Sequence, residues 1–184
     1  MPYFSWNDHS LFYREHGKGS LLLVLPGNTA SSAAHAGELE YFGARESGPH
    51  DPGCRAVSID FLGTGQSDRV EHWADDWWAQ GARQARALVD HLSYERCVVM
   101  GTSGGAIAAL WMAILFPNVV RGVIADSCVQ HFTEAMLRRN VKEERAQRAP
   151  GQIQFWQYAH GEDWSEVVDA DTALIERFVA RGGV

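Results

Sequence analysis

The stretch Gly101-Thr102-Ser103-Gly104-Gly105 decides the fold, because it joins a short apolar run at 97–100 to a helical run at 106–116. In this G-x-S-x-G pattern the small residues let the strand and the helix approach closely, and the turn between them exposes the serine hydroxyl. The backbone N–H after the serine is left free at the helix N-terminus, where it favours negative charge. The stretch therefore predicts a nucleophile elbow with Ser103 at its tip.

Strands and helices alternate on both sides of this turn. Strands are expected at 3–6, 11–16, 21–25, 56–60, 97–100 and 119–125. The run at 21–25 is apolar throughout, as in a strand buried on both faces of a parallel sheet. Helical spacing is seen at 31–46 and 73–93. The alternation predicts an α/β fold, a doubly wound and mostly parallel sheet with helices on both faces.

The chain changes character after His131. Residues 133–149 are strongly charged, Pro150-Gly151 interrupts them, and 153–160 and 165–181 predict two further helices. No strand signal follows Asp126. We therefore expect two parts, a core over residues 1–130 and a small helical segment over residues 131–184.

Composition excludes several kinds of partner. The chain has 184 residues, is 46% hydrophobic and carries a net charge of -7, so neither phosphate backbones nor anionic lipid would attract it. Residues 97–118 carry no charge, but the glycine-rich turn divides them into a strand and a helix too short to span a membrane. We expect no nucleic-acid partner and no membrane association.

No cofactor or metal is expected either. The cysteines and histidines match no metal-ligand spacing, and Gly63-x-Gly65 lacks the third glycine of a dinucleotide-binding loop. The N-terminus shows no signal peptide, and three cysteines, an odd number, favour a reducing compartment. These features predict a cytoplasmic protein.

Four segments together resemble the α/β-hydrolase superfamily, in its order and spacing. They are Leu25-Pro26-Gly27-Asn28, the D-x-x-G-x-G-x-S-D loop at 60–68, the stretch around Ser103, and Asp126. The resemblance covers residues 1 to about 130, and it implies that 131–184 form the cap, or lid, that many members insert after the sixth strand. In the family two further strand–helix units follow and carry the general-base histidine. Because this chain reaches Val184 without them, we expect a sheet truncated after its sixth strand.

The resemblance implies a role for each matching residue. Ser103 matches the nucleophile, as distinct from relatives with an aspartate at that position. The backbone N–H groups of Gly104 and Asn28 match the two donors of the oxyanion hole. Gly27 is kept beside Asn28, although Pro26 stands where many relatives have histidine.

An acid and a base are harder to place. Asp126 matches the acid of those relatives that carry it after the sixth strand, and His131, five residues on, could pair with Asp126 and reach Ser103. The alternative is that His131 caps or packs at the entry to the lid. His160 is expected to satisfy carbonyls at its own helix C-terminus. Four aromatic residues either line a pocket or pack within the lid: Phe155, Trp156, Tyr158 and Trp164.

Two functions from different classes follow. The first is a serine hydrolase that cleaves a small ester or related acyl substrate through an acyl-enzyme on Ser103. The second is a catalytically silent, hydrolase-like module that lacks the base and binds a small ligand or a partner chain. A lyase or peptidase on the same scaffold stays open. The strand at 119–125 would be an exposed apolar edge, so we also expect a homo-oligomer.

Overall fold

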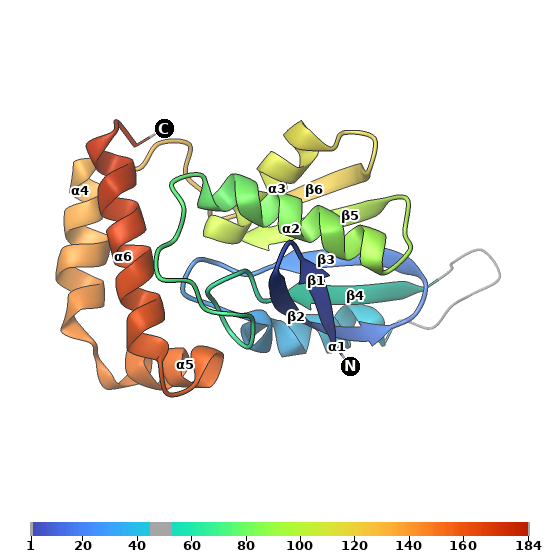
Figure 1. Ribbon diagram of the computed structural model, residues 1–184, viewed down its shortest axis with the longest axis horizontal. Helices are drawn as coiled ribbons and strands as arrows, with labels where there is room; N and C mark the ends of the chain where they lie inside the picture. The colour runs from blue at the N-terminus through green and yellow to red at the C-terminus, as the bar shows by residue number, and fades with distance from the viewer. Residues whose placement is uncertain (1, 45–52, 184) are drawn as a thin grey trace.

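The computed structural model describes residues 2–44 and 53–183, and its centre is one six-stranded sheet (Figure 1). The strands are β1 (Tyr3–Trp6), β2 (His9–Gly17), β3 (Ser20–Leu25), β4 (Cys54–Ile59), β5 (Cys97–Thr102) and β6 (Val120–Asp126). They lie in the order β1-β2-β4-β3-β5-β6. The β1–β2 and β2–β4 pairs are antiparallel, and the pairs among β3, β4, β5 and β6 are parallel. The predicted α/β class with a mostly parallel sheet is confirmed, and β6 lies at the edge.

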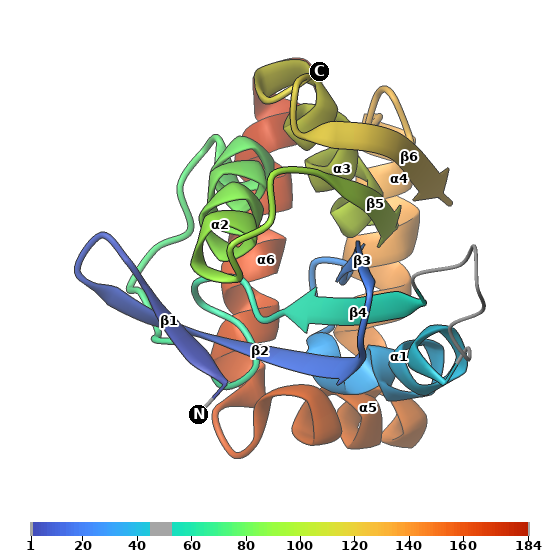
Figure 2. The same cartoon turned by 90° about the vertical axis from the view of Figure 1, so that its right-hand side faces the viewer.

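Helices cover both faces of this sheet. The short 3-10 helix η1 (Ser32–His35) leads into α1 (Ala36–Gly43), which lies on one face; α2 (Trp77–His91) and α3 (Gly104–Leu115) lie on the other (Figure 2). Successive side chains of β3 point to opposite faces of the sheet, and both faces are covered by helices, which explains why residues 21–25 are apolar throughout. Leu22 and Val24 pack on the α1 side, while Leu23 and Leu25 pack on the side of α2 and α3.

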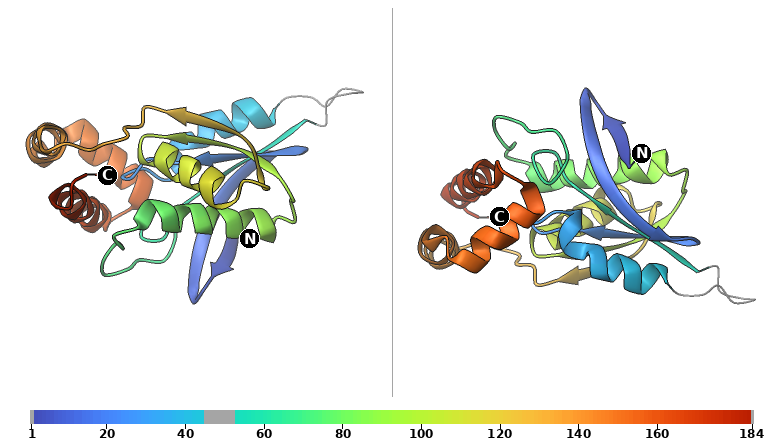
Figure 3. Two further views of the ribbon diagram at one scale, coloured as in Figure 1. Left: turned by 90° about the horizontal axis from the view of Figure 1, so that it is seen from above. Right: turned by 90° about the horizontal axis from the view of Figure 1, so that it is seen from below.

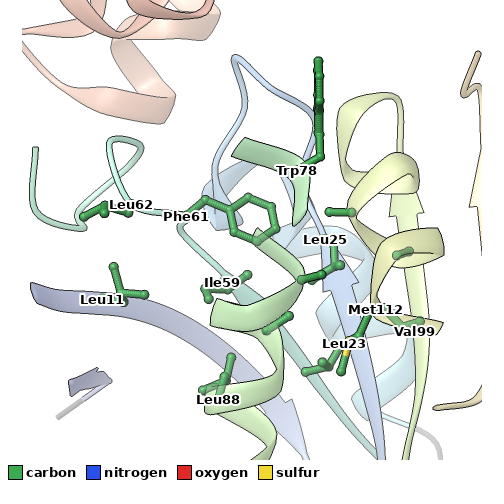
Figure 4. Packing of buried hydrophobic residues seen from close by; sticks show 14 of the residues in the cluster. Leu11, Leu23, Leu25, Ile59, Phe61, Leu62, Trp78, Leu88, Val99 and Met112 are labelled. Carbon is green, nitrogen blue, oxygen red and sulfur yellow. The ribbon is translucent and has the colours of Figure 1, made fainter. Parts of the chain in front are cut away.

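The larger part of the core lies under α2 and α3. Leu23, Leu25 and Ile59 of the strands meet Leu88 of α2 and Met112 of α3, and each is at most 1% exposed (Figure 4). Burying one such side chain stabilises the fold by roughly 1.5–3 kcal/mol. This packing fixes β3 and β5 side by side, and with them the loops that follow each strand.

The expected helix at 73–93 begins later than predicted, at Trp77. Trp73 stacks on Trp77 with ring centroids 4.6 Å apart, and the Trp73 carbonyl accepts a hydrogen bond from Arg177 at 2.6 Å. Asp75 pairs with Arg177 and Arg181 at 2.9 and 2.6 Å. These contacts with α6 (Trp164–Ala180) hold residues 73–76 outside the helix, and 75–76 form a turn before it.

After β6, the regular elements of the described chain are all helices, joined by short loops. A continuous helical segment is made of α4 (Glu134–Met136), the π-helical η2 (Leu137–Glu144) and η3 (Arg145–Gln147); α5 (Pro150–His160) and α6 (Trp164–Ala180) follow. These elements, here named the C-terminal helices, stand beside the sheet at the end where β3 and β5 finish (Figures 1 and 3). None of the helices in the described residues is long and apolar enough to cross a membrane.

Candidate functional site

The strand–turn–helix geometry expected around Ser103 is present. β5 ends at Thr102 and α3 begins at Gly104, which leaves Ser103 alone between them with φ 56° and ψ −121°. Positive φ is strained for a residue with a Cβ, and such strain persists only where the surroundings enforce it. Here the Ser103 N–H donates to the Asp126 carbonyl of β6 at 2.9 Å, which helps to hold the turn.

Glycines flank Ser103 because there is no room for side chains. A Cβ added to Gly101 would overlap the Gly105 carbonyl, and one added to Gly105 would overlap the Leu25 carbonyl. β5, α3 and the end of β3 therefore meet through bare backbone. This close packing brings the loop after β3 next to Ser103.

Gly27 and Asn28 of that loop face the serine. A Cβ built on Gly27 would lie 3.4 Å from Ser103 Cβ and 3.9 Å from Ser103 Oγ. Within the described part of the chain, the backbone N–H groups of Asn28 and Gly104 make no hydrogen bond. Two unused donors thus belong to the two segments that meet at Ser103.

The Asn28 side chain is fixed on both sides. Its Oδ1 accepts from Trp78 Nε1 at 2.9 Å, and its Nδ2 donates to Asp171 Oδ1 at 2.6 Å. The carboxamide also lies against Gly104, where an added Cβ would overlap Asn28 Oδ1. The loop is therefore clamped between α2 and α6.

Ser103 opens into a cavity of about 450 Å³ between the core loops and the C-terminal helices. The core contributes Gly27, Asn28, Thr29, Ala30, Ala34, His35, Thr102 and Ser103; the other side contributes Phe132, Asn140, Val141, Arg145, Phe155 and Ile175. Its size suits a small organic molecule. Of the four aromatic residues singled out in the sequence, Phe155 lines this cavity, whereas Trp156 and Trp164 stack on each other at 5.6 Å.

Asp126 and His131, the candidate acid and base, form no hydrogen bond with each other or with the Ser103 hydroxyl among the described residues. Asp126 lies beside Thr102 in the β5–β6 register, and its carboxylate accepts from the Ser127 hydroxyl at 3.0 Å. His131 is exposed and makes no hydrogen bond or ion pair with any described residue. Nor does any imidazole in residues 2–44 and 53–183 hydrogen-bond to Ser103 Oγ.

His160 does not serve its own helix, which corrects the expectation from the sequence. Its buried ring reaches across to two core loops: Nδ1 accepts from the Gly65 N–H at 2.9 Å, and Nε2 lies 3.1 Å from the Thr29 carbonyl. With Nδ1 as acceptor, Nε2 carries the proton and donates to Thr29. Burial lowers the pKa of His160 to about 4, so the ring is neutral near pH 7.

The loop at 60–68 has a structural role. Asp60 accepts backbone hydrogen bonds from Ser32 at 2.6 Å and Gln66 at 2.7 Å, and burial raises the pKa of its carboxyl. Next to this loop, Arg69 donates a hydrogen bond to the Asp163 carboxylate at the start of α6, at 2.7 Å. These contacts fasten the C-terminal helices to the core next to the cavity.

Sequence reasoning missed Asp171 and Arg145. Asp171 is fully buried on α6, where its carboxylate accepts from Asn28 and from Arg145 Nη1. Burial raises the pKa of Asp171, while the Arg145 charge and the Asn28 hydrogen bond oppose that rise. A signal was available, since Asp171 stands at helical spacing among the buried Val167, Leu174 and Ile175. A carboxylate in an apolar stripe indicates a buried partner.

Comparison with known proteins agrees with this geometry. The family model described as the alpha/beta hydrolase fold matches residues 20–167. The chain therefore belongs to the α/β-hydrolase fold family. A comparison with curated proteins found no match to the sequence.

Several solved structures share the fold. The enol-lactonase from Burkholderia xenovorans LB400 is 13% identical with a TM-score of 0.69, over 93% of this chain and 72% of that one. A structure from work on carboxylesterases of the Thaumarchaeon Nitrososphaera gargenis is 15% identical with a TM-score of 0.69, over 94% and 72%. MGS-M2, an alpha/beta hydrolase from a Medee basin deep-sea metagenome library, is 19% identical with a TM-score of 0.56. That match covers 66% of this chain, which spans only 42% of MGS-M2.

Proposed function

We propose that this protein is a serine hydrolase that cleaves a small ester or a related acyl substrate. The observation that carries the proposal is the Ser103 turn, with its positive φ, next to two backbone N–H groups that have no partner among the described residues. Ser103 Oγ attacks the substrate carbonyl and gives its proton to a general base, for which His131 is the proposed residue, while the N–H groups of Asn28 and Gly104 stabilise the oxyanion that forms. The intermediate then collapses: the bond between the carbonyl carbon and the ester oxygen breaks, and the leaving alcohol takes that proton. Water, deprotonated by the same base, attacks the acyl-enzyme and breaks its bond to Ser103, so that the acid is released and Ser103 regains its proton.

The substrate class rests on the cavity and on the relatives. A space of about 450 Å³, lined by Phe132, Val141, Phe155 and Ile175 together with a few polar groups, fits a small acyl compound. A lactone is a cyclic ester, so the enol-lactonase and the carboxylesterases with this fold act on one bond type. We assign the core to residues 1–130 and the cap, which lines one side of the cavity, to residues 131–184.

Fluorophosphonate labelling followed by peptide mass spectrometry tests the proposal. We expect the probe to modify Ser103 and to leave the Ser103→Ala variant unmodified. The His131→Gln and Asp126→Asn variants test the proposed base and acid, because loss of either group should slow labelling if it activates Ser103. Folded wild-type protein that remains unlabelled would contradict the proposed activity.

One observation favours a second candidate, a hydrolase-like module that binds a ligand without turning it over. Ser103 Oγ has no imidazole partner in the part of the chain that the structure describes, and a serine without a base is a weak nucleophile. In that case a phenyl ester or lactone would bind in the cavity and protect the protein against thermal unfolding without being hydrolysed.

We also infer that copies of the chain associate through β6. This strand is the parallel edge of the sheet, opposite the edge formed by β1, and Ile124 on it is 50% exposed. Unpaired backbone groups on an apolar edge favour pairing with another strand.

A further inference from the structure

Asp171 is the most deeply buried charged side chain at the contact between the core and the C-terminal helices. It is 0% exposed, and each carboxylate oxygen has one partner: Oδ1 accepts from Asn28 Nδ2, and Oδ2 accepts from Arg145 Nη1. Taking a carboxylate out of water costs several kcal/mol unless charge and hydrogen bonds compensate it. Removing either the Asn28 or the Arg145 side chain should therefore change how the Asp171 carboxylate holds the remaining partner.

The Asn28 carboxamide links this pair to the serine. Its other end accepts from Trp78 Nε1 at 2.9 Å, so the amide plane is fixed between α2 and α6. The same carboxamide lies against Gly104, the residue after Ser103. Any movement of Asn28 thus moves the loop that carries one of the two free N–H groups.

We propose that Asp171 is a positioning residue, which holds the oxyanion loop through the Asn28 side chain and so keeps the Asn28 backbone N–H directed at the reacting carbonyl. This inference rests on the function proposed above. It gives the C-terminal helices a role besides lining the cavity, because α6 supports the loop that carries one donor of the proposed oxyanion hole. Preorganised donors stabilise the developing charge only while their positions are fixed.

The chain offers a matched control for Asp171. Asp169 lies two residues earlier on α6 and pairs with Arg148 at 2.5 Å, so it joins α6 to the end of the same helical segment that carries Arg145. Asp169 is 63% exposed, however, and has no contact with Asn28. The two pairs differ in burial and in their link to the loop.

The test compares Asp171→Asn, Asn28→Ala, the double variant and Asp169→Asn. Asn28→Ala keeps the Asn28 backbone N–H and the Asp171–Arg145 pair, and it removes the carboxamide that joins Asp171 to the loop together with its hydrogen bond from Trp78. Two readouts are used: the fluorophosphonate labelling rate as a function of probe concentration, and amide hydrogen exchange of the peptide covering residues 26–35.

We expect both single variants to lower the maximal labelling rate by about a hundredfold, with little change in the probe concentration that gives half that rate. Exchange in residues 26–35 should become faster in both. The double variant should be no slower than Asn28→Ala, because both substitutions break one link. Asp169→Asn should match the wild type in both readouts.

Unchanged exchange in residues 26–35 in both single variants would overturn the inference, and so would additive effects in the double variant. If Asp171→Asn does not fold, the labelling rate and the hydrogen exchange of residues 26–35 in Asn28→Ala decide whether the inference holds. Should the wild type itself remain unlabelled, the proposed function fails, and the exchange comparison still decides whether Asp171 holds the loop.

Discussion

The absence of a single methyl group at residue 104 shapes the surroundings of the serine. Gly104 follows Ser103 at the start of α3, and the Asn28 carboxamide occupies the space that a Cβ would need. The glycine thus serves the packing of two loops as well as the sharp turn. Gly27, across from Ser103, is less confined: an added Cβ would lie 3.3 Å from the Thr102 carbonyl oxygen, a tight contact, and 3.4 Å from Ser103 Cβ.

Gly104→Ala should therefore impair the site without unfolding the protein. The new methyl group displaces the Asn28 carboxamide and misplaces one oxyanion donor, which costs on the order of a hundredfold in the rate of fluorophosphonate labelling. Gly151→Ala is the control, because a Cβ there meets nothing within 4 Å. Equal labelling rates in the two variants would show that the Asn28 carboxamide has no influence on Ser103.

Among the elements, the junction of α5 with the core loops depends on a neutral histidine. The folded protein holds the pKa of His160 at about 4, whereas an unfolded chain has the ordinary value of 6.5. Between these two values the unfolded chain binds a proton that the folded protein excludes. The free energy of unfolding should therefore fall as the pH drops from about 6.5 to 4, by up to about 3 kcal/mol, and this contribution should level off below pH 4.

Urea denaturation at several pH values checks this, with His160→Gln as the test variant. A glutamine keeps hydrogen-bonding groups but does not titrate, so the variant should lose less stability than the wild type over that window. His72→Gln is the control, since the His72 side chain is 82% exposed. Parallel pH profiles for the wild type and His160→Gln would contradict the expectation.

The packing of α2 on the sheet gives a second prediction for an element. Leu88 is completely buried against the core strands, so Leu88→Ala should leave a cavity and lower the free energy of unfolding by about 2–5 kcal/mol. Leu110 on α3 is 42% exposed, and Leu110→Ala should change stability by at most about 0.5 kcal/mol. Urea denaturation of both variants measures the difference, and a loss below 1 kcal/mol at Leu88 would argue against this packing.

For the whole molecule, the open edge of the sheet determines the expected assembly. Ile124→Lys places a charge on β6 and should shift the protein toward monomer, because a lysine opposes strand pairing at an edge. Tyr41→Lys is the control: Tyr41 is 74% exposed, but it lies on α1. Size exclusion with light scattering at micromolar concentration measures the change. A wild type that is already monomeric would contradict the expectation.

The sequence predicted the strands and the Ser103 turn, because each leaves a local pattern of apolar spacing and glycines. Gly27 and Asn28 were assigned to the oxyanion hole by the family resemblance, and that role stays a prediction. It did not predict the partners of Asp171 and His160. Asp171 contacts Asn28 across 143 positions and His160 contacts Gly65 across 95, and neither pairing leaves a periodic signal. The predicted start of α2 was wrong for the same reason: the residues before Trp77 are held by Arg177 and Arg181, which lie far away in the sequence.

The link between Asn28 and Asp171 also has a consequence for the order in which the site is made. During synthesis the loop after β3 leaves the ribosome first, the Ser103 turn follows, and α6 emerges after both. A nascent chain folded only as far as β6 already has its serine on the turn, but its Asn28 side chain lacks the Asp171 acceptor. The reactive surroundings of Ser103 are thus completed only after α6 has emerged and docked on the core.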